Sequence, residues 1–346
     1  MTETNHQVLL AARPNGFPKD SDFEIAETPV PQPGDGEVLV RNIYMSVDPY
    51  MRGRMNEFKG SYIAAFQIGK PMMGGAVGQV ISSNHAGFAE GDFVLNNNGW
   101  QEYFVRTGDK LNDGMDLNKV DPSIAPLSAY LGVIGMPGMT AYVGFEEIGV
   151  PKPGETVYIS AASGAVGAIA GQIAKIKGCR VVGSAGSDEK VAYLLDEAGF
   201  DAAFNYKTQD LNQALAETCP DGIDVNFENV GGDMLEAVLN RMNQHGRIIY
   251  CGSISGYNDT KPRPGPTNLT MMILREVTLR GYIVTSFMHM TGAFRRDMGG
   301  WLKSGQMTYR ETVVDGIENA PAAFMGMLKG ENLGKMVVKI GPDPTQ

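Results

Sequence analysis

From Pro153 onward the sequence alternates short apolar segments with amphipathic helical patterns. Strands joined by helices must run parallel, because the chain has to return to the starting edge of the sheet before the next strand begins. This rhythm predicts an α/β fold with a Rossmann-type, doubly wound parallel six-stranded sheet. The six predicted strands cover residues 156–160, 180–184, 203–206, 223–228, 247–251 and 278–284.

The first 130 residues follow another pattern and predict a β-rich domain. Short strand-like segments separated by Pro- and Gly-rich stretches cover residues 7–12, 37–46, 78–82, 93–95 and 101–106. After Trp301, strand-like pieces at 312–314 and 335–340 flank a short helical pattern at 321–328, and they most simply rejoin the first domain. A chain of 346 residues exceeds the roughly 250 to 300 residues that one core fills. We therefore expect one domain from 1–130 and 301–346, and a second from 131–300.

Composition excludes several classes of protein. The net charge is −10, from 29 Lys+Arg against 39 Asp+Glu, and this argues against a nucleic-acid partner. No window reaches the roughly 18 uninterrupted apolar residues of a membrane span, and no basic leader opens the sequence, so a cytoplasmic protein is expected. Three widely spaced cysteines form neither a disulfide framework nor a zinc motif.

Residues 161–167, AASGAVG, lie between the first strand of the second domain and a helical pattern. Compared with G-x-G-x-x-G, the segment has Ala162, Gly164 and Gly167 at the three glycine positions. The second glycine allows a pyrophosphate to approach the backbone, and the N–H groups of a helix N-terminus bind anions. Position after a strand and before a helix favours dinucleotide binding over a glycine turn that serves packing alone.

The end of the next strand indicates which dinucleotide binds. An NAD site normally has Asp or Glu there to bind the ribose 2′-hydroxyl, whereas this strand ends at Gly186 and Ser187. Ser187 and Lys190 could bind a 2′-phosphate instead, which favours NADPH. In the alternative interpretation Asp188 is the missing acid, although its position also fits the first turn of a helix.

Seven motifs in order resemble the medium-chain dehydrogenase/reductase superfamily, which combines a GroES-like catalytic domain with a Rossmann domain. The likeness is strongest to its zinc-independent group of leukotriene B4 12-hydroxydehydrogenases, prostaglandin reductases and 2-alkenal reductases, including bacterial curcumin reductases. The motifs are VDPYMRG at 47–53, GMPGMTAY at 135–142, AASGAVG at 161–167, GSDEK at 186–190, FENVGG at 227–232, CGSIS at 251–255 and GENLGK at 330–335.

The resemblance implies a homodimeric NADPH-dependent oxidoreductase that acts on CH–CH groups, transferring hydride to the β-carbon of α,β-unsaturated ketones or aldehydes. It implies that Lys190 and Tyr206 bind the 2′-phosphate and that Tyr257 contacts substrate as well as cofactor. Asn229 and Asn332 could equally be turn residues, since both lie beside glycines. The residues that the resemblance assigns to NADPH are Thr140, Gly164, Ala165, Val166, Gly167, Gly186, Ser187, Lys190, Tyr206, Asn229, Cys251, Gly252, Ser253, Ile254, Ser255, Tyr257, Tyr282, Val284 and Asn332.

No metal site is predicted. Zinc enzymes of this superfamily carry a cysteine, a Gly-His-Glu segment and a cluster of four cysteines in the first domain. The corresponding positions here begin at Ser46 and Met73, no cysteine precedes Cys179, and the four histidines are scattered. Lewis-acid activation of a carbonyl by zinc is therefore not expected.

Without a metal, a hydrogen-bond donor must stabilise the enolate oxygen that forms during conjugate reduction. Tyr50 is the candidate donor and substrate contact, because Asp48 and Pro49 turn the chain after a long strand and would bring its side chain to the domain cleft. The cofactor's ribose 2′-hydroxyl is a second candidate, and Tyr50 could instead be an aromatic wall of the pocket. Methionine-rich loops at Met51, Met55, Met136 and Met139 would suit flat apolar substrates, although methionine more commonly fills a hydrophobic core.

One departure from the family concerns a tyrosine assigned to the active site in some relatives, whose place falls on Leu274 by our alignment. Two alternatives to an enone reductase also stay open. One is a quinone reductase on the same scaffold, and the other is a protein that binds NADPH without catalysis.

Overall fold

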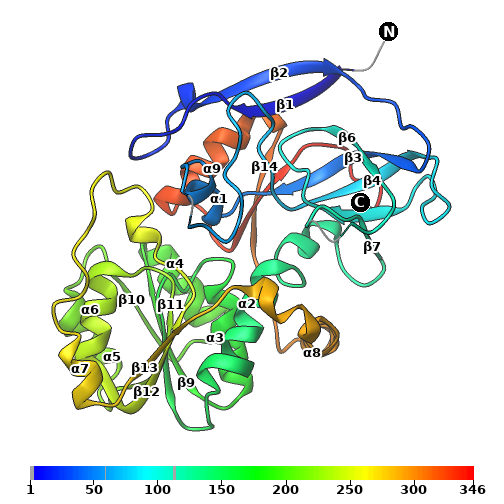
Figure 1. Ribbon diagram of the computed structural model, residues 1–346. Coiled ribbons are helices and arrows are strands. Elements are labelled where there is room, and N and C mark those ends of the chain that lie inside the picture. Colours follow the sequence, from blue (N-terminus) through cyan, green and yellow to red (C-terminus); the bar gives the residue numbers. More distant parts are fainter. Residues whose placement is uncertain (1–3, 59, 112–113) are drawn as a thin grey trace. The chain divides into compact units, whose positions relative to one another are not determined.

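The structure is a computed structural model that describes residues 4–58, 60–111 and 114–346. It divides into two compact units (Figure 1). Unit 1 comprises Met1–Leu131, Glu311–Asn332 and Met336–Gln346, and unit 2 comprises Gly132–Arg310 and Leu333–Lys335. Residues 301–310, which the sequence placed with the first domain, belong to unit 2. The helix α8 (Thr291–Ser304) continues through residue 301, and its Trp301 packs against Tyr142 at a ring-centroid distance of 6.2 Å.

Unit 1 contains a seven-stranded sheet in the order β14-β15-β3-β4-β5-β7, with β6 also paired to β3. A separate antiparallel ribbon, β1–β2, includes a strand that the sequence did not predict, and β7 was also missed. The strands of unit 1 are β1 (Thr4–Leu10), β2 (Phe23–Pro29), β3 (Glu37–Ser46), β4 (Ala76–Ser83), β5 (Phe93–Asn96), β6 (Tyr103–Thr107), β7 (Asn118–Val120), β14 (Glu311–Asp315) and β15 (Lys335–Lys339).

An aromatic core fixes the helices of unit 1. Trp100 is fully buried and packs against Phe23 and Phe324, with ring-centroid distances of 6.3 and 6.0 Å. Phe324 lies on α9 (Ala320–Lys329), and Met51 of α1 (Tyr50–Arg54) is buried in the same cluster. The core therefore holds α1, which carries Tyr50, against the body of this unit.

Unit 2 contains the predicted six-stranded parallel sheet, in the order β10-β9-β8-β11-β12-β13. The last strand ends at Gly281, three residues earlier than predicted, because Val284–Met290 form the 3-10 helix η5. The strands are β8 (Thr156–Ile159), β9 (Arg180–Ala185), β10 (Ala202–Asn205), β11 (Ile223–Glu228), β12 (Met242–Tyr250) and β13 (Thr278–Gly281). The other helices are α2 (Met136–Val143), α3 (Gly167–Ile176), α4 (Asp188–Asp196), α5 (Leu211–Thr218), α6 (Gly232–Arg241) and α7 (Thr270–Leu274).

The strand order reverses between β8 and β11. From β8 the chain passes through α3 to β9, and from β11 it passes through α6 to β12 on the opposite side. In Figure 1, α5, α6 and α7 lie on one face of the sheet and α3 on the other. Ligands of doubly wound sheets bind outside the carboxyl ends of the strands at such a reversal. The fold therefore directs attention to the ends of β8 and β11.

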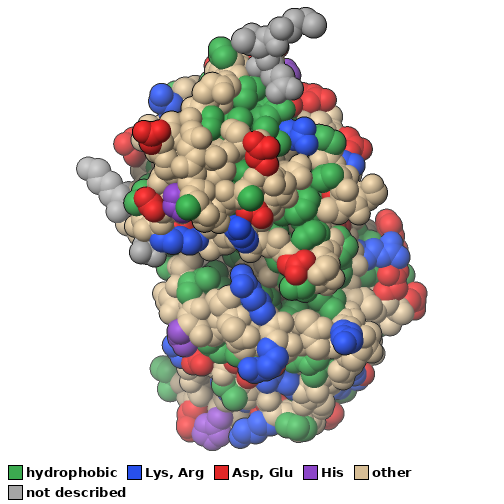
Figure 2. Space-filling model, turned by 90° about the vertical axis from the view of Figure 1, so that its right-hand side faces the viewer, with side chains coloured by type: hydrophobic (Ala, Val, Ile, Leu, Met, Phe, Trp, Pro, Cys, Tyr) green, Lys and Arg blue, Asp and Glu red, His purple; other side chains and the backbone are tan. Residues whose placement is uncertain are grey.

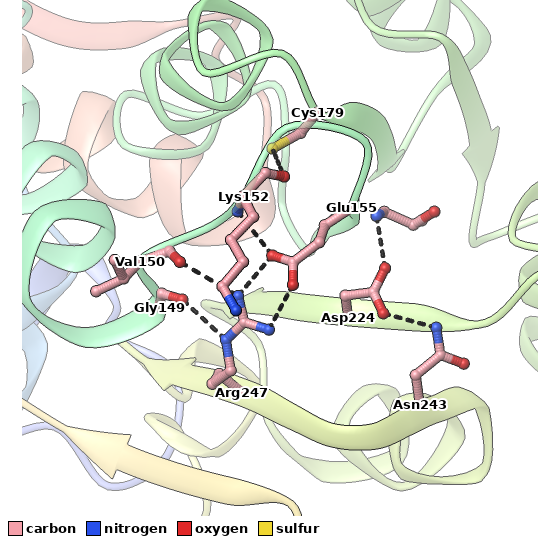
Figure 3. Close-up of polar contacts among 9 residues, drawn as sticks. Gly149, Val150, Lys152, Glu155, Cys179, Asp224, Asn243 and Arg247 are labelled. Carbon is pink, nitrogen blue, oxygen red and sulfur yellow. Dashed lines mark hydrogen bonds and ion pairs between the residues drawn. The ribbon is translucent and has the colours of Figure 1, made fainter.

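The amino ends of the same strands carry a polar network instead (Figure 3). Arg247 pairs with both carboxylate oxygens of Glu155, at 2.6 and 2.9 Å, and donates to the carbonyl oxygens of Gly149 and Val150. Asp224 accepts from the backbone N–H of Thr156 at 2.8 Å. A hollow of about 530 Å³ lies beside these groups. Because its main charges already pair with one another, we interpret this region as structural.

The surface shows no large segregation of charge on the face drawn in Figure 2, where Lys and Arg side chains are separated by acidic and uncharged residues. Among the described residues, no helix is long and apolar enough to cross a membrane.

Candidate functional site

The carboxyl ends of β8 and β11 are joined by a buried carboxylate. Glu228 is fully buried, and its Oε1 accepts from the Ser160 hydroxyl at 2.9 Å and from the N–H groups of Val230 and Gly231, each at 2.7 Å. Asn226 donates to Oε2 at 3.0 Å. Burial raises the pKa of Glu228, and the hydrogen bonds oppose that rise. The carboxylate thus holds the turn after β11 in one conformation. Sequence analysis did not single it out.

Asn229 and the loop after β12 are brought together at this edge. The backbone N–H of Asn229 donates to the Ser160 hydroxyl, and its amide donates to the Ser160 carbonyl, both at 2.8 Å. The loop bonds back to β11 through the N–H of Gly252 to Glu228 and of Ile254 to Asn229. Ser255 donates to the Val230 carbonyl at 2.7 Å. The predicted contacts Asn229 and Cys251–Tyr257 therefore form one surface, rather than an isolated turn at Asn229.

The glycine turn has the shape of a phosphate cradle. A Cβ on Gly167 would lie 2.5 Å from the Ala161 carbonyl oxygen, so the close approach of helix and strand requires glycine there. No side chain caps the N-terminus of α3. The helix α3 begins at Gly167, directly after this turn. The backbone N–H groups at the N-terminus of a helix form a favourable site for a pyrophosphate.

Gly334 supports this turn from a distant part of the sequence. Its N–H donates to the Ser163 carbonyl at 2.9 Å, and it forms a parallel bridge with Gly164. Its φ is +66°, and a Cβ would lie 2.0 Å from the Arg310 carbonyl oxygen, so only glycine fits. The predicted contact Asn332 precedes it and falls in unit 1.

The predicted 2′-phosphate contacts Ser187, Lys190 and Tyr206 lie with Gly186 and Lys207 at the ends of β9 and β10. A Cβ on Gly186 would meet the Tyr206 hydroxyl at 3.1 Å and the Lys207 side chain at 3.2 Å, so the end of β9 is open to these groups. Burial lowers the pKa of Lys190, and the nearby charge of Lys207 lowers it further. Two converging ammonium groups are a good environment for a phosphate dianion. Sequence analysis missed Lys207, although it directly follows the predicted contact Tyr206.

The alternative role for Asp188 is not favoured by the structure. Ser187 caps α4 by accepting from the N–H of Lys190 at 3.3 Å, and Asp188 is the first helical residue. Asp188 accepts from the Asn205 amide at 2.7 Å. Its carboxylate is therefore already used to join α4 to the end of β10, while the Ser187 hydroxyl keeps its proton for a ligand.

Three further predicted cofactor contacts, Thr140, Cys251 and Tyr282, lie together near the carboxyl end of β12. Tyr282 donates to the Thr140 carbonyl at 2.7 Å and is hydrogen-bonded to Cys251. Burial raises the pKa of the Cys251 thiol to about 12 despite that hydrogen bond, so the thiol is protonated at neutral pH. Val284, the fourth residue of this predicted set, opens η5. These contacts fix the loop at the end of β12 against α2.

Tyr50 is the first residue of α1 in unit 1. Burial raises the pKa of its phenol, the charge of Asp48 raises it further, and Arg54 partly offsets both. The phenol is therefore neutral at physiological pH and able to donate a hydrogen bond. Of the four methionines named in the sequence analysis, Met51, Met55 and Met139 are buried, so packing accounts for three of them, and Met136 is exposed.

Leu274 does not lie at the carboxyl edge of the unit 2 sheet. It ends α7, shortly before β13, and is 63% exposed. A residue that precedes a strand of this parallel sheet lies at the amino edge, whereas Cys251 and Tyr257 follow a carboxyl end. Leucine at this position therefore removes no donor from the site. Tyr257, in the loop that follows β12, lies at the carboxyl edge, where its hydroxyl would lie 3.5 Å from a Cβ on Gly252.

Two family models match the chain. Residues 6–113 match the family described as the N-terminal domain of oxidoreductase, and residues 165–298 match the family described as zinc-binding dehydrogenase. The second match does not include the positions near Ser46 and Met73, where zinc enzymes of this superfamily carry metal ligands. Among the described residues, no group of three or more His, Cys, Asp or Glu side chains could hold a metal ion.

Relatives match over the whole chain. It is 44% identical to the NADPH-dependent curcumin reductase of Escherichia coli over 346 residues, covering 99% of this chain and 98% of that protein. It is 46% identical to the NADP(+)-dependent 2-alkenal reductase of Nicotiana tabacum over 342 residues, covering 97% and 98%. The chain belongs to the medium-chain dehydrogenase/reductase superfamily, in this reductase group.

Solved structures of the superfamily agree with this membership. The crystal structure of CurA from Vibrio vulnificus in complex with NADPH superposes with a TM-score of 0.91 at 43% identity, covering 98% of this chain and 100% of that one. Unit 1 is therefore the GroES-like domain and unit 2 the Rossmann domain, which confirms the predicted fold class.

Proposed function

We propose that this protein is an NADPH-dependent reductase of the C=C bond in α,β-unsaturated ketones and aldehydes. The observation that carries the proposal is full-length identity of 44–46% to curcumin and 2-alkenal reductases. The 2′-phosphate site supports the choice of NADPH over NADH, since Lys190 and Lys207 converge where an NAD site has a carboxylate.

Different groups of the chain bind different parts of NADPH. The N–H groups at the start of α3 bind the pyrophosphate, Lys190, Lys207 and Tyr206 bind the 2′-phosphate, and Asn229 with the Cys251–Tyr257 loop orients the nicotinamide half. NADPH, when bound, supplies the hydride that adds to the β-carbon of the substrate. Asn332 is proposed as a further contact from the C-terminal segment.

Tyr50 is proposed as the catalytic donor. As hydride adds to the β-carbon, negative charge develops on the carbonyl oxygen, and a neutral phenol can stabilise this enolate by donating a hydrogen bond. The raised pKa of Tyr50 supports this role, because the proton stays on the phenol across the physiological range. Tyr257 is also proposed as a substrate contact.

The experiment is a turnover assay with NADPH and a panel of alkenals, cyclic enones and extended dienones. We expect NADPH consumption and the saturated carbonyl product, with deuterium from labelled NADPH at the β-carbon. An allylic alcohol would contradict C=C reduction. Faster turnover of quinones than of enones, by kcat/KM, would favour a quinone reductase, and tight NADPH binding without turnover would favour a binding protein.

A homodimer is part of the proposal. The strand β13 pairs with β12 alone among the described strands, so one edge of the unit 2 sheet has unpaired backbone groups. The adjoining α7 exposes Ile273 and Leu274, which are 78% and 63% accessible. Sedimentation should show a dimer that Ile273→Glu with Leu274→Glu dissociates. The control Ile124→Glu, at an exposed apolar residue of unit 1, should leave the dimer intact.

A cytoplasmic location is also proposed. The three cysteines are unpaired, and Cys179 and Cys219 are buried, as expected for a protein kept in a reducing compartment. Fractionation of the source cells with an antibody would test this.

A further inference from the structure

The helix α1 carries a buried arginine. Arg54 is 6% exposed, and among the described residues no carboxylate acts on its guanidinium. Burying a guanidinium is costly unless its N–H groups are hydrogen-bonded, so its actual partners define what it does.

Two contacts fix the guanidinium of Arg54. Its Nε donates to the Ala64 carbonyl at 2.9 Å, and its central carbon lies 4.2 Å from the centre of the Phe66 ring. The backbone carbonyl of Arg54 in turn accepts from the N–H of Phe66 at 2.7 Å. The side chain and the segment that follows α1 therefore hold each other in place.

Tyr50 lies one helical turn before Arg54 on α1, and Arg54 lowers the pKa of its phenol. Residues four apart on a helix lie on the same face, so the helix itself sets this pairing. A guanidinium has donors and no acceptor. Any hydrogen bond between the two side chains must therefore run from Arg54 to the Tyr50 oxygen, which leaves the single phenol proton to be donated elsewhere.

We propose that Arg54 is a positioning residue that makes Tyr50 a hydrogen-bond donor to the substrate carbonyl. This inference rests on the proposed function of Tyr50. By occupying a lone pair of the phenol oxygen from a fixed direction, Arg54 limits the directions in which the proton can point. Its positive charge also favours the build-up of negative charge on that oxygen as the proton is given.

The other charged and titratable groups that act on Tyr50 oppose this effect. Asp48 and Tyr62 both raise the pKa of the phenol, whereas Arg54 lowers it. Asp48 itself accepts from the Ser46 hydroxyl. Arg54 is therefore the one cation among these neighbours that makes the Tyr50 proton easier to share.

Arg52 provides a matched control on the same helix. It is 2% exposed and donates to the Asn56 side chain at 2.9 Å and to the Gly16 carbonyl at 2.7 Å. Arg52 is not among the groups that shift the pKa of Tyr50. Replacing either arginine removes a buried guanidinium from α1. Only replacement of Arg54 should lower kcat through its effect on the Tyr50 hydroxyl.

The experiment is a double-mutant cycle on the intact protein. Arg54→Ala, Tyr50→Phe and the double variant are assayed with a small cyclic enone and saturating NADPH, and melting temperatures are recorded. We expect Arg54→Ala to lower kcat about tenfold with little change in KM, and to have no further effect when residue 50 is Phe. Millimolar guanidinium should restore part of the kcat of Arg54→Ala and none of the double variant.

Arg52→Ala should lower the melting temperature while the folded fraction keeps the wild-type kcat. If Arg54→Ala does not fold, Arg54→Lys gives the same cycle, because it keeps the charge but loses the planar fork that joins Ala64 and Tyr50. Equal losses of kcat from the Arg54 change in the Tyr50 and Phe backgrounds would overturn the inference. Wild-type kcat in Tyr50→Phe would also overturn it, while enone reduction by the unmodified protein would still stand.

Discussion

Lys207 illustrates how an exposed cation can be missed in a sequence and recognised in a structure, here beside the predicted contact Lys190. A lysine after a strand is usually solvated, so Lys207 carries no signal beyond its neighbour Tyr206. The structure places the charge of Lys207 close enough to lower the pKa of Lys190, although burial lowers that pKa more. Arg54 was missed for the same reason, because nothing in a short helical motif shows that its side chain is buried.

The first prediction concerns cofactor choice. Lys190→Ala should weaken NADPH binding by about 1.5 to 3 kcal/mol, the value of a charge-assisted hydrogen bond, and should leave NADH binding nearly unchanged. Lys207→Ala should have a smaller effect that fades with added salt, because Lys207 is exposed. Fluorescence titration with both cofactors measures this. Equal weakening of NADPH and NADH would remove Lys190 from the 2′-phosphate site.

The second prediction concerns Tyr50. Tyr50→Phe keeps the ring and removes only the donor, so kcat should fall while KM changes little. The expected fall is roughly ten- to hundredfold, because the cofactor's ribose hydroxyl also stabilises the enolate oxygen. Steady-state kinetics with a small enone measure this. If Tyr50 is only a pocket wall, Tyr50→Phe will be nearly silent and Tyr50→Ala will raise KM.

At the scale of elements, β12 begins five residues before its predicted start at residue 247, because residues 242–246 are mostly polar. The six strands of unit 2 were predictable all the same, because short strand-like segments alternate with helical patterns. Two strands of unit 1 were not. β2 leaves most of its side chains partly or fully exposed in a two-stranded ribbon, so it lacks an apolar run, and β7 has only three residues. The glycine turn was predictable from its position between strand and helix. Glu228 was not, because a carboxylate at a strand end looks solvated until its four donors are seen.

The third prediction concerns the network at the amino ends of the strands. Burial disfavours the charge of Glu155, but hydrogen bonds from Arg247 and Lys152 and their charges outweigh it, so its pKa lies below the usual value. A depressed carboxyl pKa adds stability above the unfolded pKa, and this is lost as pH falls through the folded pKa. Glu155→Gln should therefore cost about 1 kcal/mol at neutral pH and progressively less in acid.

Melting temperatures across the acid range measure this effect, with Glu90→Gln as control because Glu90 is exposed and lies in unit 1. The Glu155→Gln and wild-type curves should converge as pH falls, and the control should follow the wild type throughout. A constant gap at every pH would show that the side chain matters for packing and not for its charge.

At the scale of the whole molecule, metal-independence is a property of how ligand types are spread along the chain. A catalytic zinc needs three protein ligands and a structural zinc four, drawn from Cys, His and carboxylates held at about 2.0 to 2.3 Å. The four histidines and three cysteines stand singly in the sequence, and Cys179 and Cys219 are buried in unit 2. Ser46, at the end of β3, instead donates to Asp48.

The last prediction follows from that distribution. The purified protein should contain no stoichiometric zinc, and its rate of enone reduction should be unchanged after incubation with a strong chelator. Stabilisation of the enolate then depends on hydrogen bonds, so Tyr50→Phe should lose the same factor in kcat with and without the chelator. Elemental analysis with parallel kinetics measures both. One zinc per chain, with activity lost on its removal and restored by its return, would replace the phenol with a Lewis acid as the group that receives the developing charge.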